Sequence, residues 1–496
     1  MPLSFAISTK IIQTSLPLKL SQEVTESESK SSAADFYAST GPMNGYLRNI
    51  GQHRNLASFW DANMIKLGVF LESLVCFDRI DPSTVIDLDG VSHIALVVVV
   101  GRDTLSGLSL ERATEAMVAC KDFLREHQVE GVECLIQMGS FNPSAAHPLQ
   151  VVEADESAGN PESLIPFTSS LGVAITTTQD PDLESTRGFF ITAADKLDGK
   201  IYFLICRHGL GTGGSGGDDQ QPITILQPPN SHFTLQTPEL LEELGTQVDA
   251  LQLRLSKPSR VMTDLRYTAA LAVHIGGLGE ALSISDACNK EEQRRAIGVV
   301  RFKPDICWSE DFTFDVAVCE ADSSRFNPTN FRGNIVDIGD ANRAAQVLSD
   351  HGLLIPADKL LPLHGVVPID EIRNWAHRSD DDLMMGMRGG RSGVVVGRAS
   401  ALLSLKRTER NIAGLPSFFS RECIVHAYDD DPSKPFSVPG DSGATVFDTQ
   451  GRILGILTGG YNHQLGAADR SYVTPAEFLL SEIGRRWKKV DLYEEE

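Results

Sequence analysis

Residues 439–447, Pro-Gly-Asp-Ser-Gly-Ala-Thr-Val-Phe, decide the fold and lie in the C-terminal third of the 496-residue chain. The glycines at 440 and 443 permit the backbone geometry of a tight turn, and an apolar, β-branched run follows. Gln450-Gly451 then marks a second turn before the apolar run Ile453 to Leu457. The pattern predicts a β-hairpin with Ser442 exposed at its mouth.

Ser442 in this setting is a candidate nucleophile. The backbone N–H groups of Gly440 and Ser442 can point at one spot, which is what a tetrahedral oxyanion needs. One such donor contributes about 3 kcal/mol to catalysis. The alternative is that Gly440-Asp441-Ser442-Gly443 forms only a turn.

A serine hydroxyl needs a base, and His208 is the leading candidate among twelve histidines. It follows the apolar run 201–206, which predicts a strand, and it precedes a glycine-rich loop. The other histidines considered lie in an N-terminal unit, before or within a helical segment, or after the serine: His93, His232, His274 and His463.

The base in turn needs an acid that fixes its tautomer. Asp315 opens the short apolar run Asp315-Val316-Ala317-Val318, where it can be buried beside an imidazole. Asp311 is the nearby alternative, and most aspartates at a strand entry are turn residues.

These segments resemble the trypsin/chymotrypsin-fold serine proteases, and more closely a group of fungal trypsin-like proteins. Leu204-Ile205-Cys206-Arg207-His208 resembles the histidine strand of that family, and residues 314–318 resemble its Asp-x-Ala segment. Gly390-Arg391-Ser392-Gly393 resembles a Gly-Arg-Thr-Gly strand, and Tyr472-Val473-Thr474-Pro475 is also similar. The resemblance covers roughly residues 165–488 well and 40–140 more loosely.

The resemblance implies an α+β protein with a chymotrypsin-like double β-barrel, a helical insert and a smaller preceding α/β domain. It implies a serine endopeptidase with His208, Asp315 and Ser442 as the triad. Phe436 is then expected near the base of the primary substrate pocket. Thr458, Gly459 and Gly460 are expected to form its wall and to pair with the backbone of a peptide substrate. With no acid at the base, we expect a small or apolar side chain there.

Departures from the family pattern leave a second hypothesis open. Leu204-Ile205 replaces the usual Leu-Thr, Gly209 follows the histidine, and Arg187-Gly188 replaces a Gly-Thr-Gly-like turn. A protein of this fold that no longer cleaves and serves as an interaction or scaffold module is therefore the alternative to an active protease.

Composition excludes other classes of partner. The net charge of -22 and the pI near 5.0 argue against nucleic acid and against anionic lipid surfaces. No run of 18 apolar residues appears, so we expect no membrane partner. The eight cysteines contain no C-x-x-C pair, which predicts reduced thiols, no metal and no cofactor. The amino-terminal residues show no secretory signal pattern, so we expect an intracellular (cytoplasmic or nuclear) protein, with organelle targeting as a weak alternative.

The chain divides into three predicted parts. Residues 20–35 are polar and rich in Ser and Glu, and the N-terminal segment 1–35 is predicted to be disordered. Residues 36–155 are predicted to form an α/β domain, with strands at 92–100 and 132–138 joined by a helix over 110–125 in a parallel βαβ unit. Its separateness raises the possibility of a protein partner. A linker at 155–161 precedes the protease-like domain, 165–490.

Within that last domain, Thr237-Pro238-Glu239 is a helix-start signal, and a helical hairpin is predicted as an insertion over 237–284. The hairpin explains the 107 residues between His208 and Asp315. A final helix is predicted over 475–487. The predicted strands are 172–178, 188–192, 200–206, 223–226, 296–302, 314–319, 393–403, 422–428, 444–447, 453–457 and 471–473.

Two other motifs fail. Residues 209–214 satisfy G-x-G-x-x-G after a strand, but a polar segment and another strand follow where a dinucleotide site needs a helix. An α/β-hydrolase is disfavoured because Ala444 replaces the second glycine of G-x-S-x-G, and only 54 residues remain for the acid and the histidine.

Overall fold

The computed structural model describes seventeen segments of the chain. They are residues 11–12, 46–48, 53–86, 91–101, 110–138, 140–143, 166–194, 199–211, 222–256, 262–308, 311–326, 331–339, 341–375, 383–408, 418–429, 434–462 and 468–494. Of the segment 1–35 that is predicted to be disordered, the structure describes only Ile11–Ile12, which form a strand paired with residues 136–137. The rest of that segment, the linker at 155–161 and most of the glycine-rich loop after His208 lie outside the described residues.

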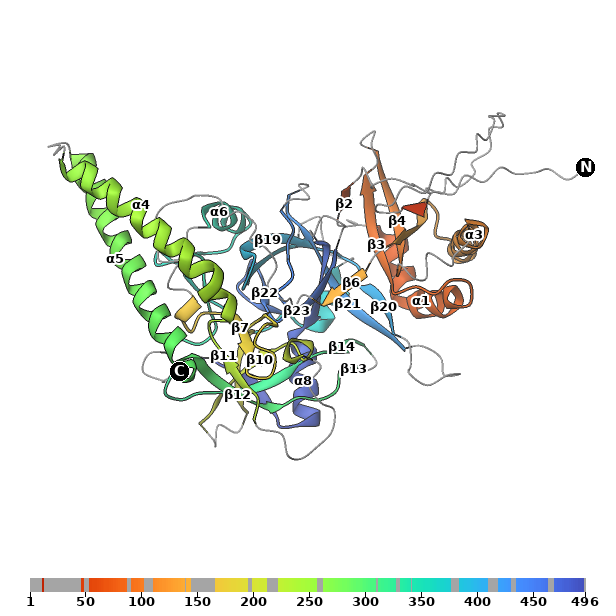
Figure 1. Cartoon of the computed structure of the whole chain (residues 1–496). Coiled ribbons are helices and arrows are strands. Elements are labelled where there is room, and N and C mark those ends of the chain that lie inside the picture. The colour runs from red at the N-terminus through yellow and green to blue at the C-terminus, as the bar shows by residue number, and fades with distance from the viewer. Residues whose placement is uncertain are drawn as a thin grey trace, which may run out of the picture.

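The N-terminal α/β unit consists of α1, β3, β4, α3 and β5 (Figure 1). β4 and β5 run parallel with Ile94 opposite Val132, which confirms the predicted βαβ crossover. Leu96, Val98 and Val100 of β4 pack into one core cluster, and alternate residues face another, so the strand is buried on both faces. The elements are α1 Arg54–Glu72, β3 Arg79–Ile86, β4 Ser92–Val100, α3 Leu110–Glu126 and β5 Val132–Met138, with β1 Ile11–Ile12 and β2 Tyr46–Arg48 paired beside them.

An eight-stranded sheet among the described residues contains β10, which His208 follows, and β15, which Asp315 precedes by two residues. β10 and β15 are antiparallel neighbours in it, with Leu204 opposite Val318. In sheet order the strands are β25 Val490–Leu492, β9 Phe190–Ala193, β10 Ile201–Ile205, β15 Ala317–Ala321, β12 Ala296–Phe302, β11 Thr224–Leu226, β7 Ala174–Thr177 and β8 Ser185–Thr186.

A thirteen-stranded sheet holds the hairpin that follows Ser442, and it continues into the α/β unit because β3 pairs with β20. Hydrogen bonding therefore runs unbroken from the α/β unit to the strands beside the serine. Besides β1 to β5, its strands are β6 Ser140–Pro143, β18 Met384–Gly389, β19 Gly393–Ala399, β20 Ser404–Thr408, β21 Phe418–Ala427, β22 Thr445–Asp448, β23 Ile453–Asn462 and β24 Ala468–Pro475.

The remaining elements are short connections and a covering helix. α8, Ala476–Arg486, packs Phe478, Leu479 and Ile483 into the main hydrophobic core. The others are η2 His208–Leu210, η3 His232–Gln236, η4 Glu292–Arg295, β13 Cys307–Trp308, β14 Thr313–Phe314, β16 Ile335–Asp337, β17 Leu360–Pro362, α6 Asn342–Asp350 and α7 Ile369–Arg373.

The predicted helical hairpin is present as α4, Thr237–Ser256, and α5, Met262–Lys290, and it projects from the body of the molecule (Figure 1). α5 ends at Lys290, beyond the predicted limit of 284. The helices are joined by a 2.9 Å contact between His274 Nε2 and Glu243 Oε1, so His274 belongs to the hairpin.

By length and composition alone, Thr268–Lys290 of α5 is long and apolar enough to cross a membrane, and 22% of its apolar window is buried. Helices of soluble proteins pass the same test, and this stretch carries the acids Glu280 and Asp286. The expectation of no membrane partner therefore stays a prediction.

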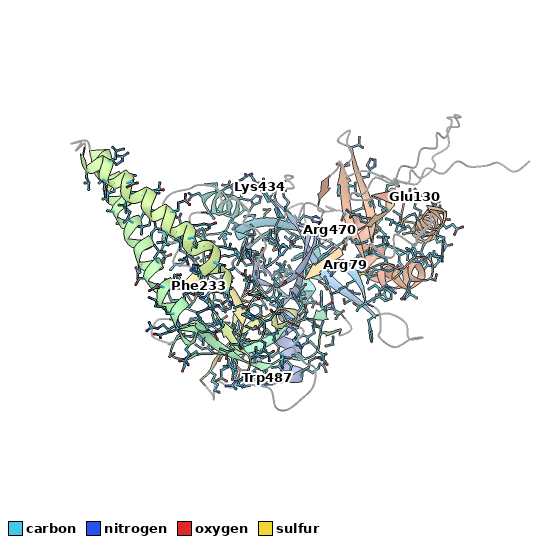
Figure 2. The ribbon with its side chains drawn as sticks, in the orientation of Figure 1. Arg79, Glu130, Phe233, Lys434, Arg470 and Trp487 are labelled. Atoms are coloured by element: carbon cyan, nitrogen blue, oxygen red, sulfur yellow. The ribbon has the colours of Figure 1, made fainter. Side chains whose placement is uncertain are left out.

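Buried charges join β3 and β5 of the α/β unit to β24 at the other end of the thirteen-stranded sheet. Arg470 on β24 donates to Asp81 on β3 (2.7 Å) and to Gln137 on β5 (2.6 Å), and the Tyr472 hydroxyl donates to Asp81 (2.8 Å). The Arg79 guanidinium stacks 3.8 Å from the centre of the Tyr472 ring. Figure 2 labels Arg79 and Arg470 at this junction.

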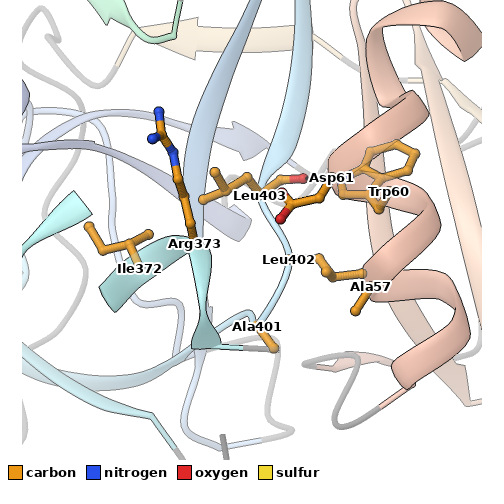
Figure 3. Close-up of a pocket in the computed structure, with 8 residues that line it drawn as sticks. All are labelled: Ala57, Trp60, Asp61, Ile372, Arg373, Ala401, Leu402 and Leu403. Atoms are coloured by element: carbon orange, nitrogen blue, oxygen red, sulfur yellow. Dashed lines mark hydrogen bonds between the residues drawn. The ribbon is translucent and has the colours of Figure 1, made fainter. Parts of the chain in front are cut away.

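A small pocket lies between α1 and the segment before β20 (Figure 3). Trp60 lines it and donates a 2.8 Å hydrogen bond to the Leu403 carbonyl, which ties α1 to that segment. The lining residues are Ala57, Trp60, Asp61, Ile372, Arg373, Ala401, Leu402 and Leu403. None of the predicted site residues lines this pocket.

Candidate active site

The structure brings His208, Asp315 and Ser442 together. The Nδ1 atom of His208 lies 2.6 Å from Asp315 Oδ2, and its Nε2 atom lies 2.8 Å from Ser442 Oγ. The His208 backbone N–H also donates to Asp315 Oδ1 at 3.1 Å. Two hydrogen bonds thus fix the carboxylate against the histidine, and the imidazole spans the gap to the serine.

The three residues come from different parts of the fold. His208 begins η2 directly after β10, and Asp315 lies before β15, the neighbour of β10. Ser442 precedes β22 of the other sheet. Asp315 does not open a strand, contrary to the prediction, because β14 ends at Phe314 and β15 begins at Ala317. This irregular backbone between the strands is what turns the carboxylate toward His208.

Electrostatics favours an ionised Asp315. Burial raises the pKa of this carboxyl, but the charge and hydrogen bonds of His208, with a contribution from Lys406, outweigh burial and leave the pKa below its ordinary value. A carboxylate only accepts hydrogen bonds, so the tautomer that fits this contact carries its proton on Nδ1 and leaves Nε2 to accept the proton of Ser442 Oγ.

Ser442 is fully buried, with 0% of its surface exposed, so the prediction of an exposed serine is wrong. β8 closes over its loop, since the Thr186 backbone N–H and the Ser185 hydroxyl both donate to the Ser442 carbonyl at 2.7 Å. The His208 side chain keeps 11% exposure. Access to the hydroxyl is therefore restricted in this conformation.

Two backbone donors remain available beside Ser442. Within the part of the chain that the structure describes, the N–H groups of Gly440 and Ser442 have no hydrogen-bond acceptor. Gly440 has a φ of 107°, in the region that favours glycine. Thr186 Oγ1 donates to the Gly440 carbonyl at 2.8 Å and so fixes the orientation of that residue.

The buried Asp441 side chain orders the loop that contains Ser442. Its carboxylate accepts the backbone N–H groups of Arg391 (2.9 Å), Ser392 (3.1 Å) and Val438 (2.8 Å). Burial raises the pKa of Asp441, and these three hydrogen bonds oppose that effect. The turn between β18 and β19 therefore provides two of the hydrogen bonds that order the loop, and Val438 of the loop itself provides the third.

The predicted substrate-binding residues lie around this loop. Phe436 is buried in the main core, and a Cβ placed on Gly397 would lie 2.6 Å from its ring. The Thr458 carbonyl accepts from Ser442 Oγ at 3.3 Å, while its hydroxyl lies 3.3 Å from the Glu422 carboxylate. Gly459 and Gly460 lie on β23, at the part that pairs with both β24 and β6.

No protein-family model and no curated protein sequence matches this chain. Among solved structures, one described as "HtrA-type protease AlgW with decapeptide" is 12% identical, with 66% of this chain and 67% of that chain covered. The TM-score is 0.26, which is too low to show a common fold.

The alternative residues take other roles in the structure. His232 is buried, and its Nδ1 contacts Gln236 Oε1 at 2.6 Å; burial lowers its pKa. Asp311 pairs with Arg373 at 2.9 Å. Of the acids considered, Asp315 is the one that contacts His208.

Sequence reasoning missed the buried charges beneath the site. Glu422 accepts from Thr313 (2.9 Å) and lies 3.4 Å from Lys406. Burial raises the pKa of Glu422, but Lys406, Arg79 and the Thr313 hydrogen bond outweigh it and bring the pKa below its usual value. The available signal was a single acid within the largely apolar run around Cys423 and Ile424.

Proposed function

We propose that this protein is a serine endopeptidase with a chymotrypsin-like double β-barrel, similar to the fungal trypsin-like proteins. The observation that carries the proposal is the 2.8 Å distance between His208 Nε2 and Ser442 Oγ, with Asp315 on the opposite ring nitrogen. Nucleophile, base and orienting acid in one hydrogen-bonded line are the arrangement that peptide hydrolysis by serine requires.

In the proposed reaction, His208 takes the proton of Ser442 as its Oγ attacks the carbonyl carbon of a peptide bond. The resulting oxyanion accepts from the N–H groups of Gly440 and Ser442. His208 then gives the proton to the leaving amine, and the acyl group stays on Oγ. A water molecule, deprotonated by His208, releases the acid and restores the serine.

Selectivity in this proposal follows from the apolar surroundings of Phe436. No acidic side chain is expected at the base of the pocket, so a small or apolar residue is preferred before the cleaved bond. Profiling with a peptide library tests the preference, and selectivity for arginine would overturn it.

Cysteine chemistry supports an intracellular setting for this activity. All eight cysteines are free, and six of them are buried. Free thiols in this number are typical of reducing compartments. We therefore propose that the enzyme acts in the cytoplasm or nucleus, which microscopy of the chain with a fluorescent tag tests.

A fluorophosphonate probe tests the nucleophile. The probe phosphonylates an activated serine and carries no peptide backbone, so it reports on the triad alone. We expect covalent labelling at Ser442, located by mass spectrometry, in the wild-type protein and none in Ser442→Ala. Ser437→Ala serves as the matched control because Ser437 is also buried, on the same loop. Well-folded protein that is not labelled at Ser442 would indicate a scaffold module instead.

A further inference from the structure

β6 follows β5 directly and leaves the α/β unit to pair with β23. Its residues run antiparallel to β23, with Pro143 opposite Gly459 and Asn142 opposite Gly460. In Figure 1, β6 lies beside β23, although residues 140–143 and 459–462 are far apart in the sequence. β6 thus comes before the proposed protease domain in the sequence, but it pairs with a strand of that domain next to Ser442.

β6 pairs with the part of β23 at which the proposed protease is expected to bind a peptide substrate. β22 pairs with Ile453 to Ile456 on one edge of β23, and β24 takes the other edge. Between β22 and β6 lies Thr458, whose carbonyl contacts Ser442 Oγ at 3.3 Å. In the proposed protease, Thr458, Gly459 and Gly460 are expected to pair with the backbone of a peptide substrate, and β6 pairs with this edge at Gly459 and Gly460.

The docked α/β unit fixes β6 in this place. Gln137 lies three residues before β6 and accepts a 2.6 Å hydrogen bond from Arg470 on β24, the neighbour of β23. Arg470 also pairs with Asp81 at 2.7 Å, and both of these side chains are fully buried. This buried contact therefore anchors the end of β5 to β24, which pairs with the edge of β23 opposite to the one that β6 covers.

We propose that β6 acts as a built-in competitive inhibitor that occupies the substrate-binding edge of β23, so that a peptide gains access to Ser442 only after β6 has left. The inhibitory role of β6 rests on the proposed function, whereas the pairing of β6 with the edge of β23 does not depend on catalysis.

The first experiment tests occupancy in the inactive Ser442→Ala protein. Proline has no N–H and resists strand geometry, so Phe141→Pro/Asn142→Pro removes whichever of the two N–H groups faces β23. We expect faster hydrogen exchange at the amides of residues 459–462 in this variant. Tyr46→Pro/Leu47→Pro, in the short strand β2, is the matched control and leaves those amides unchanged.

The second measurement uses a fluorescent peptide with the sequence of residues 139–144, Gly-Ser-Phe-Asn-Pro-Ser. If the edge is open in roughly a tenth of the molecules, removing β6 tightens binding of this peptide about tenfold. We expect at least that change between Ser442→Ala and its double-proline variant. Equal binding and equal exchange in both proteins would overturn the proposal.

The third measurement separates this inference from the proposed function. With Ser442 intact, the double-proline variant is expected to hydrolyse fluorescein-labelled casein at least tenfold faster than wild type, while fluorophosphonate labelling occurs in both. Faster exchange and tighter peptide binding without labelling or hydrolysis would retain β6 as the occupant of a peptide-binding edge and reject the protease. Labelling with unchanged casein hydrolysis, exchange and peptide binding would retain the protease and reject the inhibitory strand.

Discussion

His208 Nε2 lies 2.8 Å from Ser442 Oγ although 234 residues separate the two side chains in sequence. They come from different sheets, and β8 joins those sheets where Thr186 donates to the Ser442 carbonyl. The alignment of base and nucleophile therefore depends on how the two sheets pack, and the predictions below test the alignment, the charges around it and the backbone that supports it.

Asp315→Asn is expected to lower the rate of peptide hydrolysis by about 10⁴-fold. An amide can donate to His208 Nδ1, which favours the tautomer that points a proton at Ser442 Oγ and so removes the base. Casein hydrolysis measures the loss. Asp311→Asn is the control, because Asp311 pairs with Arg373 and Arg421. A similar loss of activity in Asp311→Asn would show that the assignment of Asp315 as the acid is wrong.

The Asp315 carboxylate also makes stability depend on pH. Burial raises its pKa, but the contacts with His208 outweigh burial, so the folded pKa lies below the unfolded value of about 3.9. Its contribution is therefore complete above the unfolded pKa and is lost as pH falls through the folded pKa. We expect the free energy of unfolding, measured with urea, to fall more steeply for wild type than for Asp315→Asn between pH 5 and pH 2. This range covers about three units around the unfolded pKa. Parallel curves would contradict this.

Arg470→Met is expected to destabilise the fold by about 3–5 kcal/mol, because the buried Asp81 carboxylate then loses the positive charge with which it pairs. Adding Asp81→Leu removes the orphaned charge and should restore much of that loss. Arg125→Met is the matched control, since Arg125 and Asp122 form an ion pair in which each side chain is 56% exposed. Its effect should stay below about 1 kcal/mol. Chemical denaturation followed by circular dichroism gives all three values.

Gly443→Ala is expected to reduce both stability and fluorophosphonate labelling. Gly443 has a φ of 96°, and an added Cβ would lie 2.1 Å from the Thr186 carbonyl oxygen. Gly279→Ala provides the contrast, since no atom lies within 4 Å of a Cβ there and α5 is helical. That change should stabilise by about 1 kcal/mol. If Gly443→Ala behaved like Gly279→Ala, the close contact between β8 and the Ser442 loop would be wrong.

The sequence predicted the local elements well where periodicity and capping act over short distances. β12 has the predicted bounds, and α4 contains the predicted helix, but Thr237 has helical φ and ψ and follows the helical turn η3 directly, so the predicted helix start at Thr237 is wrong. Chain order and residue type also selected the three residues that the structure brings together. The buried state of Ser442 could not be predicted, because it depends on β8 and on sheet packing rather than on the turn that contains the serine.

Long-range strand pairing was beyond the sequence for the same reason. Nothing in Ser140-Phe141-Asn142-Pro143 marks it as a partner of residues 459–462, since four residues of mixed polarity carry no register. The pairing of β3 with β20 was equally hidden. Arg79 and Asp81 gave a signal, as charged residues at the start of a strand, but their partners lie more than 300 residues away.

The pairing of Ile80 with Leu405 has a consequence for how the molecule comes apart. A polypeptide that starts at residue 165 would expose the bare edge of β20 and would leave Arg470 without its acid. Such a fragment is expected to aggregate by adding strands from other copies. The chain that includes the α/β unit should instead melt in one calorimetric transition. The α/β unit with β6 and the proposed protease domain would then unfold together.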